Sequence, residues 1–132
     1  MDKLELLNDH PLPFAKVLGL KFVAASEAGV KAEMVVKPEL CTRPDILHGG
    51  AVMAFADTLG GVSAFLNLPD GGRTTATVES KTNFFRAVRE GRLEGVTRPL
   101  HVGRTFIVVQ TDVYDAQQRH VAQVTQTQAV LG

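Results

Sequence analysis

One aspartate, Asp57, lies in a stretch of residues that are otherwise apolar or small. If this stretch is helical, Asp57 lies about 200° around the axis from Phe55 and points away from the apolar side. Its neighbours at helical spacing are nearly all small, namely Gly50, Met53, Ala54, Gly60, Gly61 and Ala64. Because glycine inside a helix costs about 1 kcal/mol relative to alanine, close approach of another backbone or of a ligand is the ordinary reason for such residues. A carboxylate in this setting can act as a base or a nucleophile; the alternative is a surface or capping aspartate without chemistry.

The same stretch begins with His48-Gly49-Gly50, which follows a segment that contains two prolines. The first N–H groups of a helix lack intrahelical acceptors and lie at the positive end of the helix dipole. Two glycines there allow a substrate oxygen to come close, which is suited to holding a developing oxyanion. The alternative is a flexible N-cap without chemistry, and both His48 and His101 are more typical of structural hydrogen-bonding residues.

The elements that must position these residues follow from hydrophobic periodicity and turn residues. A long amphipathic helix is predicted from His48 to about Leu66, because apolar residues recur at steps of three and four. We also predict a short helix at 12–19, strands at 20–27, 30–37, 73–88, 91–102, 104–115 and 119–131, a loop at 38–47 and a turn at 69–72. Both faces of the strand at 104–115 are expected to be buried. The fold class is α+β, with one long central helix and an antiparallel sheet of about six strands.

The composition limits the class of protein. The chain has 132 residues and predicts a single domain over residues 1–132. Its 14 basic and 14 acidic side chains give a formal net charge of zero, which argues against nucleic acid or a membrane as a partner. Residues 1–10 lack the pattern of a signal peptide and no wholly apolar run approaches the about 20 residues of a membrane span, so we expect a cytoplasmic protein. The one cysteine, Cys41, excludes an intramolecular disulfide, and no histidine pair has metal-ligand spacing, so we expect no metal and no other cofactor.

Three segments together resemble a known family. They are 48–58 (HGGAVMAFADT), with an acidic residue nine positions after the histidine, 77–87 (TVESKTNFFRA) and 101–105 (HVGRT). Their order and spacing are similar to those of hotdog-fold acyl-CoA thioesterases of the phenylacetate-degradation type, and the resemblance covers residues 14–131. The sequence departs from the family pattern at Thr42, where related enzymes usually carry Asn or Gln, and at Ala87, where they carry proline.

The resemblance implies a hotdog fold, in which a central helix is wrapped by the sheet, and homodimers that often pair into homotetramers. It implies that Asp57 is the catalytic carboxylate and that Gly49 supplies the backbone N–H that polarises the thioester carbonyl. It also implies that Thr77, on the following strand, assists the water or the carboxylate. We place His48, at the helix start, with these catalytic residues.

The substrate implied by the family is an acyl-CoA thioester, whose phosphates need cations. Residues 81–104 carry six basic side chains against two acidic ones, and we select Arg86 and Arg104 because they lie in the family-like segments. A charged strand edge exposed to solvent is an equally good interpretation of any single arginine. Gly50, Met53 and Gly61 are the other expected substrate-binding residues. The acyl group stays open between aryl-acetyl, hydroxybenzoyl and medium-chain.

The spacing of Gly49 and Asp57 makes a further prediction. They are eight residues apart, about 12 Å along one helix, so they cannot both contact one small carbonyl. We therefore expect Gly49 of one subunit to work with Asp57 of another, in a homodimer or homotetramer. Asp57 would attack the carbonyl and form an anhydride or deprotonate a water, and the sequence leaves both routes open. The alternative function is a non-catalytic acyl-CoA sensor on the same fold.

Overall fold

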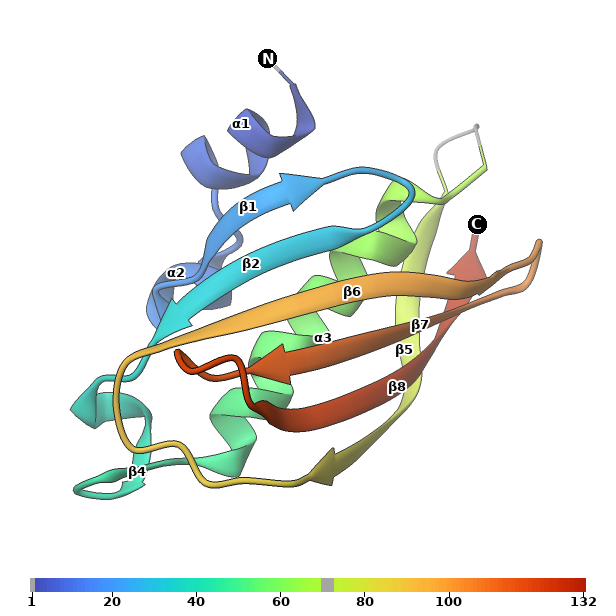
Figure 1. Cartoon of the computed structure of the whole chain (residues 1–132). Coiled ribbons are helices and arrows are strands. Elements are labelled where there is room, and N and C mark those ends of the chain that lie inside the picture. Colours follow the sequence, from blue (N-terminus) through green and yellow to red (C-terminus); the bar gives the residue numbers. More distant parts are fainter. Residues whose placement is uncertain (1, 70–72) are drawn as a thin grey trace.

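The computed structural model describes residues 2–69 and 73–132. Figure 1 shows two short N-terminal helices followed by a curved sheet that wraps one long helix. The helices are α1 (Lys3–Asp9), α2 (Pro13–Leu18) and α3 (Gly49–Leu66), with a 3₁₀ turn, η1, at Pro38–Leu40. The strands are β1 (Lys21–Ala25), β2 (Val30–Val35), β3 (Cys41–Arg43), β4 (Ile46–Leu47), β5 (Thr74–Phe84), β6 (Arg92–Val102), β7 (Phe106–Tyr114) and β8 (His120–Leu131).

Six strands form one sheet in the order β1-β2-β6-β7-β8-β5, and every neighbouring pair is antiparallel. β3 and β4 form a separate two-stranded ribbon beside the start of α3. The predicted α+β fold, with a long helix packed on a six-stranded antiparallel sheet, is therefore confirmed.

Several local predictions need correction. Residues 3–9 form α1, which was not predicted; Asp2 caps it by accepting the Glu5 N–H at 2.8 Å. The expected loop at 38–47 contains η1, β3 and β4, and the strand expected to reach residue 88 ends at Phe84. Residues 70–72 of the expected turn lie outside the described residues.

Strand β7 is buried on one face only, which corrects the expectation of burial on both faces. Its inward residues, Ile107, Val109, Thr111 and Val113, are fully buried, whereas the alternate residues are half-buried or, at Phe106, exposed. The physical reason is that α3 covers the concave face, while no layer covers the convex face in the part of the chain that the structure describes.

Close packing of α3 on the sheet positions the helix. Phe55 and Leu59 are fully buried, and Gly95 of β6 lies beneath them. A Cβ atom at Gly95 would lie 2.8 Å from a methyl carbon of Leu59 and 2.9 Å from the ring of Phe55. The helix therefore approaches as closely as a glycine allows. By length and hydropathy alone α3 could cross a membrane, but half of it is buried inside the chain.

The two edges of the sheet differ. At β1, the Asn8 side chain donates to the backbone oxygen of Phe22 at 2.9 Å and accepts from the Phe22 N–H at 3.0 Å, so α1 takes the place of a neighbouring strand. At β5, only β8 is paired with the strand among the described residues. All 11 residues of β5 are exposed or half-buried, and Val78 and Phe84 are among the exposed ones. A long uncovered edge is a template for pairing with another chain.

The turn between β7 and β8 fixes the start of β8. The buried Asp115 carboxylate accepts from the backbone N–H groups of Gln117 and Arg119 at 3.0 and 2.9 Å and from Arg119 Nε at 2.8 Å. Burial raises the pKa of the Asp115 carboxyl, but donation from the backbone and the guanidinium of Arg119 outweighs it, and the net pKa is lowered. The turn is therefore held by an ionised carboxylate.

Replacing the amide that covers the β1 edge tests its role. Asn8→Ala is expected to lower the free energy of unfolding by about 1–3 kcal/mol, because two hydrogen bonds to Phe22 are lost. Urea unfolding of the variant measures the change, with Asp9→Ala, an exposed neighbour on the same helix, as the control. Equal stabilities of the two variants would show that Asn8 does not hold α1 on the sheet.

Candidate active site

The candidate site is built around Asp57, which lies in the middle of α3 with its carboxylate exposed. Thr77, on the adjacent edge strand β5, donates its hydroxyl to Asp57 Oδ1 at 3.3 Å. Two residues selected from the sequence, twenty positions apart, therefore lie in contact. A β-bulge between Thr77 and Glu79 lies at this point of β5, and such bulges re-aim side chains.

Two glutamines on β8 complete the group, and the sequence analysis did not find them. Gln126 and Gln128 are 0% and 1% exposed. Gln126 donates from Nε2 to Asp57 Oδ1 at 3.4 Å, and Gln128 donates from Nε2 to Thr77 Oγ1 at 2.7 Å. One signal was present: both glutamines occupy the inward positions of β8, in register with the buried Val124 and Val130. A polar residue in an apolar register needs a partner.

The two helix glycines have different surroundings. A Cβ at Gly60 would overlap the side-chain amide of Gln126, so this glycine is explained by close approach, although of a side chain rather than of a backbone or ligand. A Cβ at Gly61 would meet no atom within 4 Å among the described residues. Met53, one turn before Asp57, is 42% exposed.

The start of α3 is organised by His48. Its Nδ1 accepts the backbone N–H of Gly50 at 2.7 Å, so His48 is the N-cap. The N–H of Gly49 donates to no acceptor within the described residues. The aromatic ring of Phe84, at the end of β5, lies against Gly49, where a Cβ would be 3.2 Å from it.

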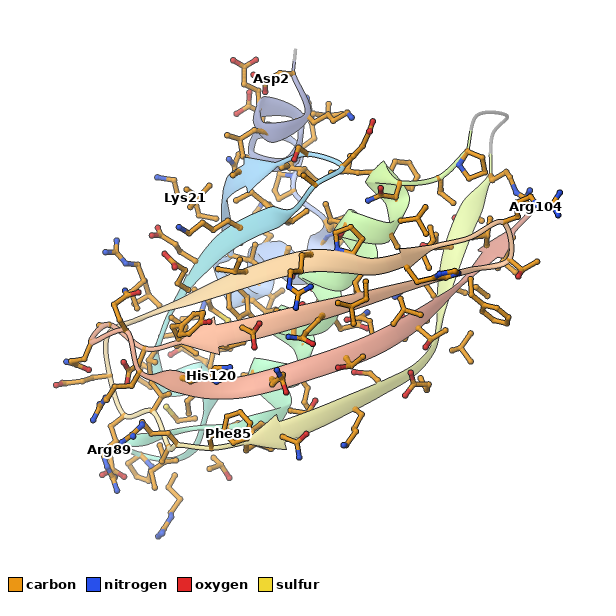
Figure 2. The ribbon with its side chains drawn as sticks, turned by 45° about the vertical axis from the view of Figure 1, so that its right-hand side comes forward. Asp2, Lys21, Phe85, Arg89, Arg104 and His120 are labelled. Atoms are coloured by element: carbon orange, nitrogen blue, oxygen red, sulfur yellow. The ribbon has the colours of Figure 1, made fainter. Side chains whose placement is uncertain are left out.

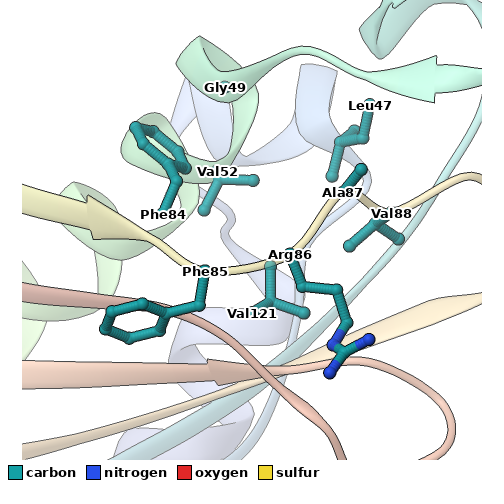
Figure 3. Close-up of a pocket in the computed structure, with 9 residues that line it drawn as sticks. All are labelled: Leu47, Gly49, Val52, Phe84, Phe85, Arg86, Ala87, Val88 and Val121. Carbon is teal, nitrogen blue, oxygen red and sulfur yellow. The ribbon is translucent and has the colours of Figure 1, made fainter.

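A pocket of about 330 Å³ opens beside this helix start. Its lining is largely apolar and comes from three regions of the chain, with Leu47, Gly49, Val52, Phe84, Phe85, Arg86, Ala87, Val88 and Val121 (Figure 3). Arg86 supplies the one charged side chain of the lining, and it extends away from Gly49. Such a lining suits an apolar group with a charged end.

The two arginines selected for phosphate binding are not brought together within one chain. Arg86 follows the end of β5, near the start of α3, whereas Arg104 lies in the turn between β6 and β7. That turn is at the opposite end of the sheet, as the labels of Arg104 and of Phe85 in Figure 2 show. His101 is exposed near the same turn.

Thr42 and Cys41, which the sequence analysis also considered, lie outside the group of side chains around Asp57. Thr42 is exposed on β3. Cys41 is half-buried, and its thiol donates to the backbone oxygen of Lys37 at 3.5 Å. Across residues 2–69 and 73–132, no three His, Cys, Asp or Glu side chains are grouped so that they could hold a metal ion.

Comparison with known proteins now defines the class of this protein. The model of the Thioesterase superfamily matches residues 45–122. The chain is 33% identical over 130 residues to the proofreading thioesterase EntH of Cronobacter turicensis, covering 98% of this chain and 94% of that protein. It is 31% identical over 114 residues to the 1,4-dihydroxy-2-naphthoyl-CoA hydrolase of Escherichia coli, covering 86% and 83%. Among solved structures, the thioesterase HI1161 of Haemophilus influenzae superimposes with a TM-score of 0.92 at 27% identity, covering 100% of this chain and 92% of that one.

The fold and the family together are those of a hotdog thioester hydrolase. The chain belongs to the Thioesterase superfamily. The prediction of a hotdog thioesterase is therefore confirmed, whereas the phenylacetate-degradation type stays a prediction.

The neighbouring glycines of α3 provide a matched test of the site's packing. Gly60→Ala is expected to lower the free energy of unfolding by about 1–3 kcal/mol, because its methyl group displaces the Gln126 amide. Gly61→Ala enters open space and is expected to leave stability equal or raise it by up to about 1 kcal/mol through helix propensity. Urea unfolding compares the two variants, and the reverse order of stability would contradict the packing described.

Proposed function

We propose that this protein hydrolyses an acyl- or aryl-CoA thioester to the free acid and CoA, with Asp57 as the general base or nucleophile. The observation that carries the proposal is an exposed carboxylate whose Oδ1 accepts from both Thr77 and Gln126. The relatives' names support the substrate class, since one of them is a hydrolase of an aromatic acyl-CoA. The apolar pocket beside Gly49 is suited to the acyl or aryl group.

The chemistry needs only water and these side chains. In the base route, Asp57 takes a proton from water, the water oxygen bonds to the acyl carbon, the C–S bond breaks, and the proton passes to the leaving thiolate. In the nucleophile route, Asp57 bonds to the acyl carbon, the thiolate leaves, and water then cleaves the anhydride. In both routes the carbonyl oxygen gains negative charge, which the Gly49 N–H stabilises.

The reacting groups come from two subunits in this proposal. Gly49 and Asp57 belong to the same α3, and their axial separation of about 12 Å is too large for one carbonyl. Strand β5 supplies the link, because Thr77 contacts Asp57 and Phe84 contacts Gly49. We propose that β5 pairs antiparallel with β5 of a second copy, in the register that places Thr77 opposite Phe84 of that copy. Asp57 would then lie near the second subunit's helix start.

The same pairing would bring the expected phosphate-binding arginines, Arg86 and Arg104, together from two subunits. It would bring the end of β5, with Arg86, beside the start of the second subunit's β5, and Arg104 lies at that end of the sheet. CoA phosphates would then be held by arginines of both subunits. Met53 and Gly61, on the same side of α3 as Asp57, would line the acyl site. We also propose that the enzyme is a homodimer or homotetramer that acts in the cytoplasm.

Substitution of the carboxylate tests the proposed reaction. Asp57→Asn is nearly isosteric but cannot accept a proton or attack, so kcat for acyl-CoA hydrolysis is expected to fall by about 10²–10⁴-fold. Thiol release from several acyl- and aryl-CoA thioesters is the measurement, with a binding titration on the same variant. Asp112→Asn, an aspartate on the outer face of the sheet, is the matched control.

The outcomes separate an enzyme from a sensor. An inactive variant that still binds acyl-CoA assigns catalysis to Asp57. Activity within about threefold of the wild type would remove Asp57 from the mechanism, and a wild-type protein that binds but never hydrolyses would favour a ligand sensor.

Removal of the Gly49 N–H tests the shared site. Proline is tolerated in the first turn of a helix, and His48 has the extended backbone that a residue before proline requires, with ψ 132°. Gly49→Pro is expected to lower kcat by about 10²–10³-fold. Gly49→Ala adds a similar Cβ beside Phe84 but keeps the N–H, so it should lose much less activity.

Mixing two inactive variants shows which subunit supplies each group. When Asp57→Asn and Gly49→Pro chains are unfolded together and refolded, mixed dimers carry one intact site if the groups come from different subunits. About a quarter of the wild-type activity is then expected for random pairing. Sites confined to single subunits would remain inactive in every pairing.

A further inference from the structure

The geometry points to Gln126 and Gln128 as positioning residues that hold Oδ1 of Asp57 and leave Oδ2 as the reacting oxygen. This inference rests on the proposed thioesterase reaction and deepens it. It also assigns Thr77 to the carboxylate rather than to the attacking water. The direction of each hydrogen bond in the group decides which oxygen of Asp57 is held.

The bond between Gln128 and Thr77 fixes the direction of the first chain. Gln128 Nε2 is a donor, so Thr77 Oγ1 accepts it at 2.7 Å. The single hydroxyl proton of Thr77 is then free to point to Asp57 Oδ1, at 3.3 Å. The opposite direction would place a hydroxyl lone pair against a carboxylate, which has no proton to donate. The proton of Thr77 is therefore committed to Asp57.

The second chain ends at the same oxygen. Gln126 Nε2 donates to Asp57 Oδ1 at 3.4 Å, and Gly60 leaves room for the amide beside the helix. Gln126 Oε1 is buried without a hydrogen-bond partner in the part of the chain that the structure describes. Turning the amide over would place this oxygen against the carboxylate. The Gln126 amide therefore leaves its own Oε1 unpaired and directs its NH₂ group to Asp57.

The two chains distinguish the carboxylate oxygens. Oδ1 accepts from Thr77 and from Gln126, whereas no hydrogen bond to Oδ2 is formed within residues 2–69 and 73–132. Oδ2 is therefore the oxygen that takes the proton from water or bonds to the acyl carbon. Gln126 and Gln128 occupy inward positions of β8 between the buried Val124 and Val130, where an amide is costly unless it is hydrogen-bonded. Gln126 is bonded to Asp57 directly, and Gln128 is bonded to Thr77, which in turn donates to Asp57.

The test uses near-isosteric variants that remove a donor. Gln128→Met, Gln126→Met and Thr77→Val are each expected to lower kcat by about tenfold to a hundredfold with KM nearly unchanged, because a misplaced carboxylate affects the reaction rather than binding. Thr77→Ser, which keeps the hydroxyl, should recover most of the loss seen for Thr77→Val. Gln123→Met is the matched control, since Gln123 lies on the same strand and donates to Asp112 on the outer face.

A double-variant cycle distinguishes positioning from general packing. If Gln128 acts through Thr77, the Gln128→Met/Thr77→Val double variant should be no slower than Thr77→Val alone. Unfolding curves identify any variant that fails to fold. If the glutamine variants do not fold, the comparison of Thr77→Val with Thr77→Ser, at an exposed residue, carries the test. Unchanged kcat in folded variants, additive losses in the double variant, or equal losses at Gln123 would each overturn the inference. The proposed function is tested separately, by hydrolysis in the wild type and its loss in Asp57→Asn. It can therefore hold even if the glutamine variants overturn this inference.

Discussion

The contacts at Asp57 depend on how closely α3 packs against the sheet. On the sheet side, Gly95 lets Phe55 and Leu59 sit directly on β6. On the helix side, Gly60 admits the amide of Gln126. A methyl group at either position would overlap a side chain whose place is fixed, and the dense packing of a protein interior leaves little room for relaxation. The carboxylate is therefore held at hydrogen-bond distance from β5 and β8 by two close approaches, not by loops.

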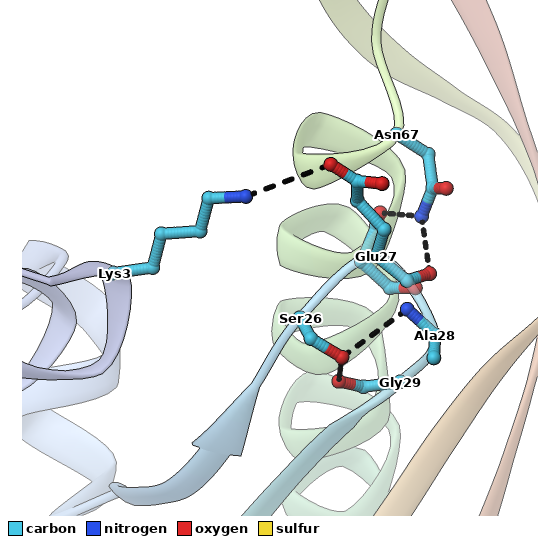
Figure 4. A network of polar contacts seen from close by, with 7 residues as sticks. Lys3, Ser26, Glu27, Ala28, Gly29 and Asn67 are labelled. Carbon is cyan, nitrogen blue, oxygen red and sulfur yellow. Dashed lines mark hydrogen bonds and ion pairs between the residues drawn. The ribbon is translucent and has the colours of Figure 1, made fainter.

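The length of α3 imposes the second constraint. If Gly49 is the oxyanion donor, as we propose, this group and a carboxylate two turns later cannot both act on one carbonyl within a single chain. The two sheet edges differ in a way that fits this constraint, because Asn8 of α1 covers the β1 edge, while the outer side of β5 has no neighbour among the described residues. Figure 4 shows that α1 is also tied by Lys3 to Glu27 of the β1–β2 turn, at 3.8 Å, and Asn67 at the end of α3 donates to the backbone oxygen of Glu27 at 3.0 Å. The β1 edge is thus occupied within the chain, and we propose that a second copy pairs at β5.

Sequence alone predicted the residues that have local signals and missed those that depend on pairing across strands. Asp57 among small residues and the glycines after His48 were visible because helical spacing brings them onto one side. Gln126 and Gln128 are marked locally only as polar residues in the inward register of β8. Their partners follow from the pairing of β8 with β5 and from the bulge beside Thr77, which no local pattern encodes. The arginines at 86 and 104 were grouped by segment, yet the sheet places them at opposite ends. The burial of β7 was overestimated because apolar residues also favour strands that have an open face.

A crystal structure with a ketone analogue of an acyl-CoA, in which carbon replaces the thioester sulfur, tests the central claim most directly. The measured quantities are the distances from the ketone carbon to the two oxygens of Asp57 and from the ketone oxygen to the backbone nitrogens of both subunits. We expect Oδ2 of Asp57, or a water bonded to it, within about 3–3.5 Å of the ketone carbon, and the Gly49 nitrogen of the other subunit at a similar distance from the ketone oxygen. A ketone held by Gly49 and Asp57 of one chain, or approached by Oδ1, would contradict it.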